Sequence, residues 1–318
     1  MKYVAIVFAL LITPVSAFAT PLTAEDRDAV LRETATLIEA RYVDPAKARL
    51  IAREMRKAAP NWRTIFDAEE FARTISQWLR KTASDGHFAL DYSPAEIIEN
   101  EPSSFGEAEM IKYYGPQVNH GIEKIERLPG NIILLDVRVF PPLPMAADMF
   151  TAMMTIAAQG DALIIDLRRN GGGADTANLM SGYLLPPGSK MSGGYDRPSN
   201  SYSTQISPYW VPGRVFGSEK PIYILTSKKT FSAAEAFAYD FQALKRATIV
   251  GEVTGGGANP FEYRRVHPHF ALSLPEARSI NPITGTNWQD VGVQPDVLVA
   301  ADQALETALQ LAQEKLKK

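Results

Sequence analysis

Two kinds of hydrophobic pattern follow one another along the chain. Between residues 23 and 82 the apolar positions recur at the i, i+3, i+4 spacing of amphipathic helices. The polar residues Thr23, Asp44 and Asp67 are suited to cap the starts of three such helices. From Asn131 onward, short apolar runs alternate with helical stretches, which is typical of an α/β fold with right-handed crossovers. The sequence therefore predicts a small helical domain followed by an α/β core.

The pattern divides the chain into four expected parts. They are a signal peptide, an N-terminal helical domain, a linker and the α/β core, at residues 1–19, 20–92, 93–121 and 122–318. The linker is polar and weakly periodic. Within the core, the stretch 186–221 is rich in Gly, Ser, Pro and Tyr. It is too long for an ordinary connection, so we expect it to form a lid or a substrate wall.

The first residues have the three parts of a secretory signal peptide. Lys2 precedes the apolar run 4–12, and Ala17-Phe18-Ala19 supplies an Ala-x-Ala cleavage site. The apolar run is too short to span a bilayer. We therefore expect cleavage after Ala19, a mature protein that begins at Thr20, and a periplasmic or secreted location without a membrane span.

Composition excludes several functional classes. The 318 residues carry a net charge of −3, and we see no basic stripe that would bind phosphates, so nucleic acid is not an expected partner. The chain has no cysteine, which excludes disulfides, thiolate metal ligands and a cysteine nucleophile. The oligomeric state is not encoded in these patterns.

Ser232 is the candidate nucleophile. A strand, a tight turn and a helix follow one another between Pro221 and Leu244, and Ser232 stands where the helix begins. At a helix N-terminus the first N–H groups lack intrahelical partners and the macrodipole is positive. An oxyanion formed by attack from Ser232 would be met by the amide of Ala233. The alternative is structural, because Ser232 and Glu235 have the spacing of a capping box.

A second strand, from Ala162, leads into the turn Gly171-Gly172-Gly173. Glycines adopt positive φ angles and allow close approach, so the amides of Gly171 and Gly172 are candidate second donors to the oxyanion. An ordinary glycine turn is the alternative interpretation.

His87, in the stretch Ser84-Asp85-Gly86-His87-Phe88, is the candidate base. A serine hydroxyl is a poor nucleophile until a neighbouring base takes its proton, and histidine titrates in the suitable range. A surface turn residue is the alternative for a histidine after Asp-Gly. The remaining histidines are weaker candidates: His120 lies in a polar loop, and His267 and His269 flank an expected hairpin corner.

Four motifs follow one another within residues 160–299. They are Asp-Leu-Arg-Arg-Asn-Gly-Gly-Gly at 166–173, Thr-Phe-Ser-Ala-Ala-Glu at 230–235, Gly-Glu-Val-Thr-Gly-Gly-Gly at 251–257 and Gly-Val-Gln-Pro-Asp at 292–296. Together they resemble the tail-specific, or C-terminal-processing, serine peptidase family. The similarity is greatest to the branch of the tricorn core and the repeats of interphotoreceptor retinoid-binding protein. The Asp85-Gly86-His87 stretch also looks like this branch.

The resemblance implies a crotonase-like β-α core in which Ser232 is the nucleophile and Ala233 and the Gly171-Gly172 turn supply the oxyanion donors. In the processing-protease branch a lysine base stands where this chain has Gly257. The tricorn-like branch uses a histidine from the N-terminal segment instead, and His87 matches it. The resemblance therefore implies a serine and histidine mechanism without a metal or an organic cofactor.

The same branch carries a supporting glutamate just ahead of the Gly-Val-x-Pro-Asp motif. Gln289 stands at that place here, and Asp290 is the nearest carboxylate. The catalytic set implied by the resemblance is thus Ser232 and His87, supported by Asp290 or Gln289. Between the linker and Ile122 there is no room for the PDZ module that many processing proteases insert.

These observations predict a secreted serine endopeptidase of the tail-specific family that hydrolyses polypeptide substrates through an acyl-enzyme. Two alternatives stay open on sequence. One is a catalytically impaired protein that binds apolar ligands or peptides on the same fold, which Gln289 favours. The other is an esterase, which would use the same groups.

Overall fold

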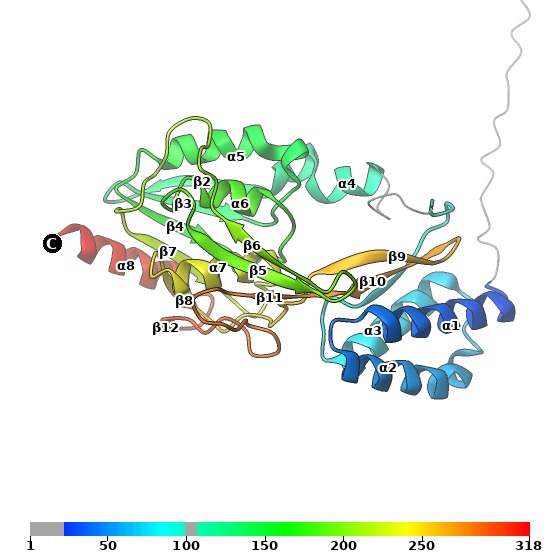
Figure 1. The fold of residues 1–318 in the computed structure, drawn as a ribbon. Helices are drawn as coiled ribbons and strands as arrows, with labels where there is room; N and C mark the ends of the chain where they lie inside the picture. The colour runs from blue at the N-terminus through cyan, green and yellow to red at the C-terminus, as the bar shows by residue number, and fades with distance from the viewer. Residues whose placement is uncertain (1–21, 99–106) are drawn as a thin grey trace, which may run out of the picture.

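The structure is a computed structural model, and it describes residues 22–98 and 107–318 (Figure 1). The expected signal peptide, its cleavage site and part of the expected linker lie outside these residues. Among the helices that are described, none has the length and hydropathy needed to cross a membrane.

Three helices form the N-terminal region: α1 (Ala24–Arg41), α2 (Pro45–Ala58) and α3 (Ala68–Ala83), with a short 3₁₀ turn at Ala59–Trp62. All three begin behind their predicted caps. The side chains of Thr23, Asp44 and Asp67 each accept hydrogen bonds from amides of the first helical turn. The predicted helix starts are therefore confirmed.

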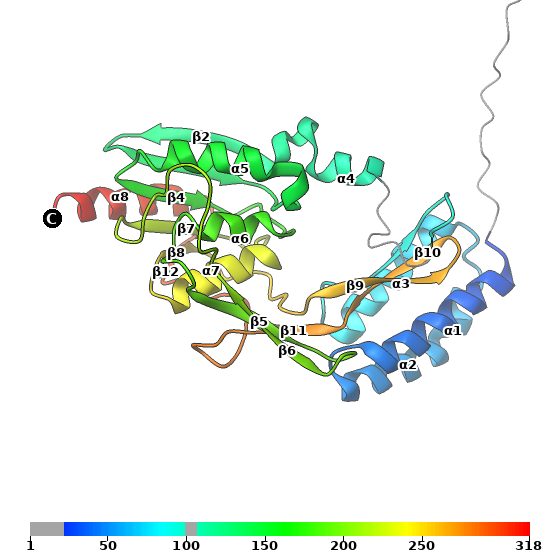
Figure 2. The same ribbon diagram turned by 45° about the horizontal axis from the view of Figure 1, so that its top comes forward.

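The helices bury their apolar faces against a small sheet whose strands come from distant segments of the chain. Its strands, in spatial order, are β1 (Ala89–Tyr92), β10 (Phe270–Pro275) and β9 (Phe261–His267). Phe71 of α3 meets Phe270 edge-on, with ring centroids 6.0 Å apart. We call α1–α3 with β1, β9 and β10 the helical lobe (Figure 2).

The late hairpin was predicted from sequence, and the structure confirms it. Its position was not predicted, because residues 261–275 were assigned to the α/β core and instead complete the core of the helical lobe. Pairing of β1 with β10 joins distant segments of the chain, and no local pattern encodes that contact.

The α/β core is built on a six-stranded sheet. Its spatial order is β12 (Val297–Leu298), β8 (Thr248–Gly251), β7 (Ile222–Thr226), β4 (Ala162–Asp166), β3 (Ile132–Val137) and β2 (Ile122–Leu128). The strands from β3 to β12 pair in parallel, and β2 is antiparallel at the edge. This arrangement confirms the predicted α/β class.

Helices cover both faces of this sheet (Figure 1). One face packs on three helices: α5 (Leu143–Ala157), α6 (Thr176–Ser181) and α7 (Ala233–Ala243). The other packs on the closing helix α8 (Ala304–Leu316) through its stripe Ala304, Ala308 and Ala312. The strands alternate between the two faces, as Ile164 and Leu225 contact the α8 side while Ile165 and Ile224 contact the α5–α7 side.

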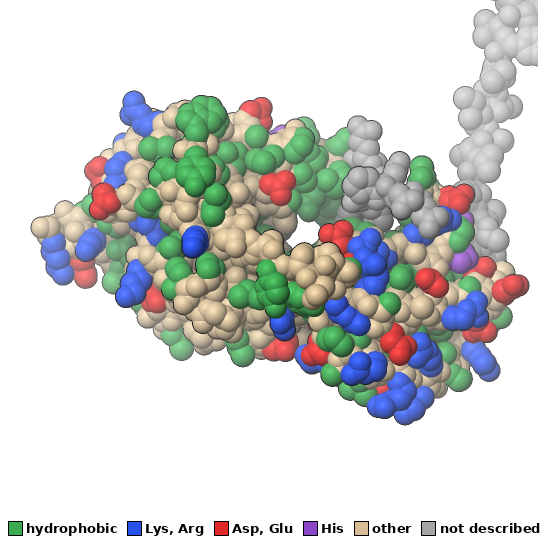
Figure 3. Space-filling model, viewed as in Figure 1, with side chains coloured by type: hydrophobic (Ala, Val, Ile, Leu, Met, Phe, Trp, Pro, Cys, Tyr) green, Lys and Arg blue, Asp and Glu red, His purple; other side chains and the backbone are tan. Residues whose placement is uncertain are grey.

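Two stretches differ from expectation. The stretch 186–221 contains the antiparallel strands β5 (Lys190–Asp196) and β6 (Ser201–Ile206), which extend the short strand β11 (Ala277–Ile280) into a sheet of their own. The end of the expected linker is also structured, as helix α4 (Glu107–Tyr114) and a 3₁₀ turn at Pro116–Gly121. In the space-filling view a small opening lies between the α/β core and the helical lobe, and the two regions are in contact below it (Figure 3).

Candidate active site

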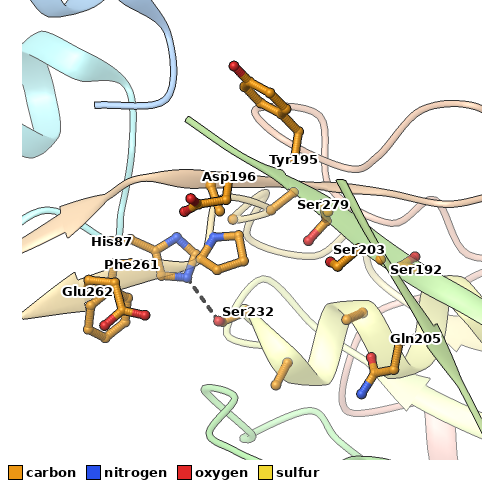
Figure 4. A pocket seen from close by; sticks show the side chains of 18 of the residues that line it. His87, Ser192, Tyr195, Asp196, Ser203, Gln205, Ser232, Phe261, Glu262 and Ser279 are labelled. Carbon is orange, nitrogen blue, oxygen red and sulfur yellow. Dashed lines mark hydrogen bonds between the residues drawn. The ribbon is translucent and has the colours of Figure 1, made fainter. Parts of the chain in front are cut away.

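Ser232 occupies a strained turn between β7 and α7. Its backbone has φ 53° and ψ −123°, a positive φ that a non-glycine residue adopts only where its surroundings enforce it. Such a strand-to-helix elbow presents a side chain at the edge of a parallel sheet. The Ser232 hydroxyl lies 2.9 Å from His87 Nε2, so the two predicted groups meet in hydrogen-bond contact (Figure 4).

The capping-box arrangement of the same residues is also present. The Glu235 carboxylate accepts a hydrogen bond of 2.9 Å from the Ser232 amide, as in a capping box. The Ser232 hydroxyl at the same time contacts His87. The two interpretations are therefore compatible, because the backbone of Ser232 is held by Glu235 while its side chain is directed to the histidine.

His87 reaches the core from the helical lobe. Helix α3 is capped at its C-terminal end by Ser84, whose left-handed φ of 51° turns the chain out of the helix and into the segment that carries His87. The His87 side chain is 4% exposed, and its imidazole contacts the rings of Phe231 and Phe261, whose centroids lie 4.8 and 5.7 Å away. These aromatic rings fix the plane of the imidazole beside Ser232.

The carboxylate nearest to the imidazole is that of Asp85, which sequence reasoning overlooked. Its Oδ1 lies 3.5 Å from His87 Nδ1 and accepts a 3.1 Å hydrogen bond from the His87 amide. Nδ1 has no closer hydrogen-bond partner among the described residues. The separation exceeds an ordinary hydrogen bond, as is common for catalytic contacts in a free enzyme. Asp85 thus favours the tautomer in which Nδ1 carries the proton and Nε2 faces Ser232.

Asp85 is itself anchored by side chains from two other segments. Its Oδ2 accepts hydrogen bonds of 2.8 Å from Asn259 Nδ2 and 3.3 Å from the Tyr42 hydroxyl. Burial acts to raise the pKa of Asp85, but the bonds from His87 and Asn259 outweigh it and the pKa lies below its ordinary value. The carboxylate is therefore charged at neutral pH and can stabilise an imidazolium.

The structure corrects the predicted roles of Asp290 and Gln289. Asp290 is directed to solvent, where it pairs with Lys47 at 3.6 Å and accepts a bond from Gln289 Nε2 at 2.9 Å. Gln289 Oε1 accepts from the amide of Ala258 at 2.7 Å. Neither side chain is hydrogen-bonded to the imidazole, and Asp85 is the carboxylate that lies beside it.

The glycine turn also differs in detail from the prediction. The amide of Gly172 donates a 2.8 Å hydrogen bond to Asn170 Oδ1, so it is not available to an oxyanion. Gly171 is exposed and does not border the groove at Ser232, whereas Gly173 and Ala233 do. The candidate donors are therefore Ala233 and Gly173, a correction of one residue along the turn.

Gly172 has a packing role instead. A Cβ atom on it would lie 2.8 Å from Ser232 Cβ and 3.0 Å from the Ala233 amide nitrogen, and its φ is 109°. Only glycine allows this turn to approach the nucleophile so closely.

Glu235 is a second residue whose role was not predicted. Its side chain is completely buried and accepts four hydrogen bonds, from the amides of Ser232, Gly256 and Gly257 and from the Thr254 hydroxyl. Burial raises the pKa of Glu235, and these bonds act in the opposite direction. The carboxylate ties the strained serine turn to the glycine loop that faces it.

The position that carries a lysine in the processing-protease branch has no space for a side chain here. A Cβ atom on Gly257 would lie 2.2 Å from the Phe231 ring and 2.9 Å from His87 Cε1. Phe231 and His87 together fill the volume that a lysine would need. Because Phe231 and His87 occupy this volume, the same packing that positions His87 also excludes a lysine side chain at position 257.

Ser232 and His87 border a groove of about 700 Å³ between the β5–β6 hairpin and the start of β9. The expected substrate wall is therefore formed by residues of β5 and β6, Ser192 to Asp196 and Ser203 to Gln205 (Figure 4). The other three histidines lie elsewhere: His120 is in the 3₁₀ turn before β2, and His267 and His269 are at the tip of the β9–β10 hairpin. No set of three or more His, Asp or Glu side chains in the described ranges is arranged to hold a metal ion.

Comparison with known proteins agrees with this geometry. The family model of peptidase family S41 matches residues 135–299. The tricorn protease of Thermoplasma volcanium is 28% identical over 184 aligned residues, and the match covers 55% of this chain and 17% of that protein. The chain thus spans about a sixth of the length of this relative.

Solved structures share the fold at low sequence identity. A lipoprotein from Streptococcus agalactiae has a TM-score of 0.62 at 16% identity and covers 95% of this chain and 100% of its own. The tricorn protease crystal structure has a TM-score of 0.59 at 15% identity, covering 92% and 37%. The photosystem II D1 C-terminal processing protease has a TM-score of 0.52 at 16% identity, covering 92% and 97%.

The fold and the Ser232–His87 contact are those expected in a family of serine peptidases. The chain belongs to peptidase family S41, whose model matches more than half of its residues.

Proposed function

We propose that this chain is a secreted endopeptidase of the tail-specific branch and that it cleaves polypeptides through an acyl-enzyme on Ser232. The observation that carries the proposal is the 2.9 Å contact between Ser232 Oγ and His87 Nε2, with the Asp85 carboxylate behind the imidazole. A serine, a base within hydrogen-bond reach and a group that orients the base are the parts that acyl transfer requires.

In the first half of the reaction, Ser232 Oγ bonds to the peptide carbonyl carbon while His87 Nε2 takes the hydroxyl proton. The carbonyl oxygen becomes an oxyanion that accepts hydrogen bonds from the amides of Ala233 and Gly173. The charged Asp85 stabilises the imidazolium. His87 then gives the proton to the leaving amine as the C–N bond breaks, and the acyl group remains on Ser232.

In the second half, His87 takes a proton from water while the water oxygen bonds to the acyl carbon. The ester bond to Ser232 breaks, the proton returns to Oγ, and a carboxylic acid leaves. Every proton transfer passes through His87, and water is the co-reactant that the second half consumes.

The test is hydrolysis of an unfolded protein substrate, with hydroxylamine added to trap the acyl-enzyme. We expect peptide products from the wild-type chain, and hydroxamates at the new C-termini when hydroxylamine is present. Product release that is equal in Ser232→Ala would contradict the proposal. Ester turnover without any peptide cleavage would instead favour the esterase alternative.

The sequence feature that favoured a catalytically impaired binding protein no longer supports that alternative. It rested on Gln289 in place of a supporting carboxylate, and the 3.5 Å separation of Asp85 Oδ1 from His87 Nδ1 supports Asp85 as that carboxylate. Tail-specific action is tested by mapping the cut sites, because it requires that cleavage begin near the substrate C-terminus.

The secreted location rests on the pattern of residues 1–19. A bacterial host that expresses the chain with this segment intact should export it with Thr20 as the first residue. Exported protein that begins before Pro14 would contradict cleavage after Ala19.

A further inference from the structure

A second cavity opens beside Ser232 and continues along α7. Its volume is about 430 Å³. It shares Gly173, Ala233 and Ala236 with the groove of the catalytic pair and extends past them to Asp240. Gly173 and Ala233 are the candidate oxyanion donors. When their amides bind the scissile carbonyl of a substrate, the side chain of the substrate residue that carries this carbonyl lies at the opening of the cavity.

One face of α7 forms a wall of the cavity. Positions 233, 236, 237, 240 and 241 follow the i, i+3, i+4, i+7, i+8 spacing of a helix face, and all five line the cavity. Ala233 and Ala236 leave space near Ser232, and Phe237 and Phe241 make the deeper part apolar. Asp240 is the one charged residue on this face, and its side chain is 5% exposed.

The hydrogen bonds of Asp240 leave one of its oxygens without a donor. Oδ1 accepts from the Ser192 amide at 2.9 Å, the Ser192 hydroxyl at 2.5 Å and Asn281 Nδ2 at 2.8 Å. Oδ2 accepts no bond from any described residue, and it is not among the fully enclosed atoms that lack a partner. Oδ2 therefore has no donor among the described residues, and Asp240 lines the cavity.

Among the described residues that line the cavity, none is a cation that could compensate this carboxylate. The residues that line the cavity include Asp175 and Asp240 and contain no Lys, Arg or His. The neighbouring groove adds Asp196 and Glu262 and likewise contains no Lys or Arg. Burial without a cationic partner raises the pKa of Asp240, although the bonds from Ser192 and Asn281 oppose the shift. A positively charged ligand group would remove that cost.

We propose that this cavity is the specificity pocket for the substrate residue on the acyl side of the scissile bond and that it selects arginine or lysine, with Asp240 Oδ2 as the counter-ion. The inference rests on the proposed peptidase function and adds the substrate class. Asp240 follows Ser232 by eight positions, and eight rises of 1.5 Å place it about 12 Å along the helix. A long side chain with an apolar stem and a cationic end fits these dimensions and this lining.

The experiment compares two peptides that differ only in arginine or citrulline before the cut site. Citrulline has the shape of arginine without its charge. We expect kcat/KM of the wild-type enzyme to be higher for the arginine peptide by on the order of 10²-fold, because a buried carboxylate without a cationic partner binds a cation more tightly than a neutral group. Asp240→Asn should reduce this ratio to within about threefold, because the amide keeps an oxygen for Ser192 and Asn281 and loses only the charge.

Asp290→Asn is the matched control, because it removes a carboxylate at an exposed site and should leave the arginine-to-citrulline ratio unchanged. Each preparation is also labelled with a small neutral fluorophosphonate to count reactive Ser232. Labelled enzyme that cleaves both peptides equally, or that cleaves neither, overturns the specificity pocket while Ser232 remains reactive. Enzyme that neither labels nor cleaves contradicts the proposed function itself.

Discussion

Ser232 and His87 are held in place by contacts of different range. The backbone of Ser232 is fixed by Glu235, which also binds the amides of Gly256 and Gly257 within the same α/β core. His87 comes from the helical lobe, and its supporting Asp85 is anchored by Asn259, which lies 174 positions away in the chain. The nucleophile is thus assembled from contacts within 25 positions, whereas the base depends on the docking of the two regions.

This difference has a mechanical consequence. Loss of contact between the regions would separate His87 from Ser232 without disturbing the serine turn. Asp85 lies at that junction, because it links His87 of the helical lobe, Tyr42 of the segment after α1 and Asn259 of the core. The base side is therefore expected to be the more sensitive one to mutations at the junction.

The first prediction removes the base. His87→Ala should lower kcat by on the order of 10² to 10⁴, because Ser232 would lose the group that takes its proton. The fold of the α/β core should persist, since the hydrogen bond to Ser232 is the one that His87 makes to the core within the described part of the chain. Steady-state kinetics with circular dichroism checks both parts, and full activity in His87→Ala would require a different base.

The second prediction removes the charge behind the base. Asp85→Asn should lower kcat by on the order of 10² with a smaller change in KM, because the imidazolium loses its counter-charge and the tautomer is less well fixed. Asp290→Asn is the control and should stay within about twofold of wild type, since its carboxylate pairs with Lys47 in solvent. The reverse order of these two effects would restore the assignment made from sequence.

A third variant tests the nucleophile side. In Glu235→Gln the side-chain NH₂ group would face backbone N–H groups that now donate hydrogen bonds to the carboxylate. Some of these buried N–H groups would therefore be left unpaired. We expect a loss of unfolding free energy of about 2 kcal/mol. We also expect kcat to fall by roughly tenfold, because the serine turn loses its support. Thermal unfolding and kinetics measure the two effects, and unchanged stability would show that Glu235 does not hold the turn.

The smallest predicted effect concerns acid. The pKa of Asp85 in the folded state lies below its ordinary value of 3.8, so its stabilising contribution is complete above that value and is lost as the pH falls through the lower one. The unfolding free energy of the wild-type chain should therefore drop below about pH 4, and Asp85→Asn should show a shallower decline. Parallel curves for both proteins would mean that Asp85 contributes nothing to this loss.

The same contrast explains which parts of the molecule the sequence could predict. The helix caps at Thr23, Asp44 and Asp67, the α/β order and the turn at Ser232 are local patterns, and the structure contains them. Glu235 was visible as the fourth residue of a capping box, but its bonds to the loop 254–257 depend on the tertiary fold. The glycine turn was predicted to within one residue.

The supporting carboxylate was the main error, and its cause is physical. Asp85 lies two positions from His87, yet its function follows from Asn259 and Tyr42, which hold its second oxygen. The choice of Asp290 came from a position in the chain near a known motif, and a turn directs that side chain to Lys47. The Asp-Gly-His sequence itself was the signal that could have identified Asp85.

The most direct test of the account is to label the folded protein with a fluorophosphonate and locate the adduct by peptide mapping. We expect a single adduct on Ser232 that is absent in Ser232→Ala and that forms on the order of 10²-fold more slowly in His87→Ala. An adduct that forms at the wild-type rate in Ser232→Ala would contradict the assignment of the nucleophile.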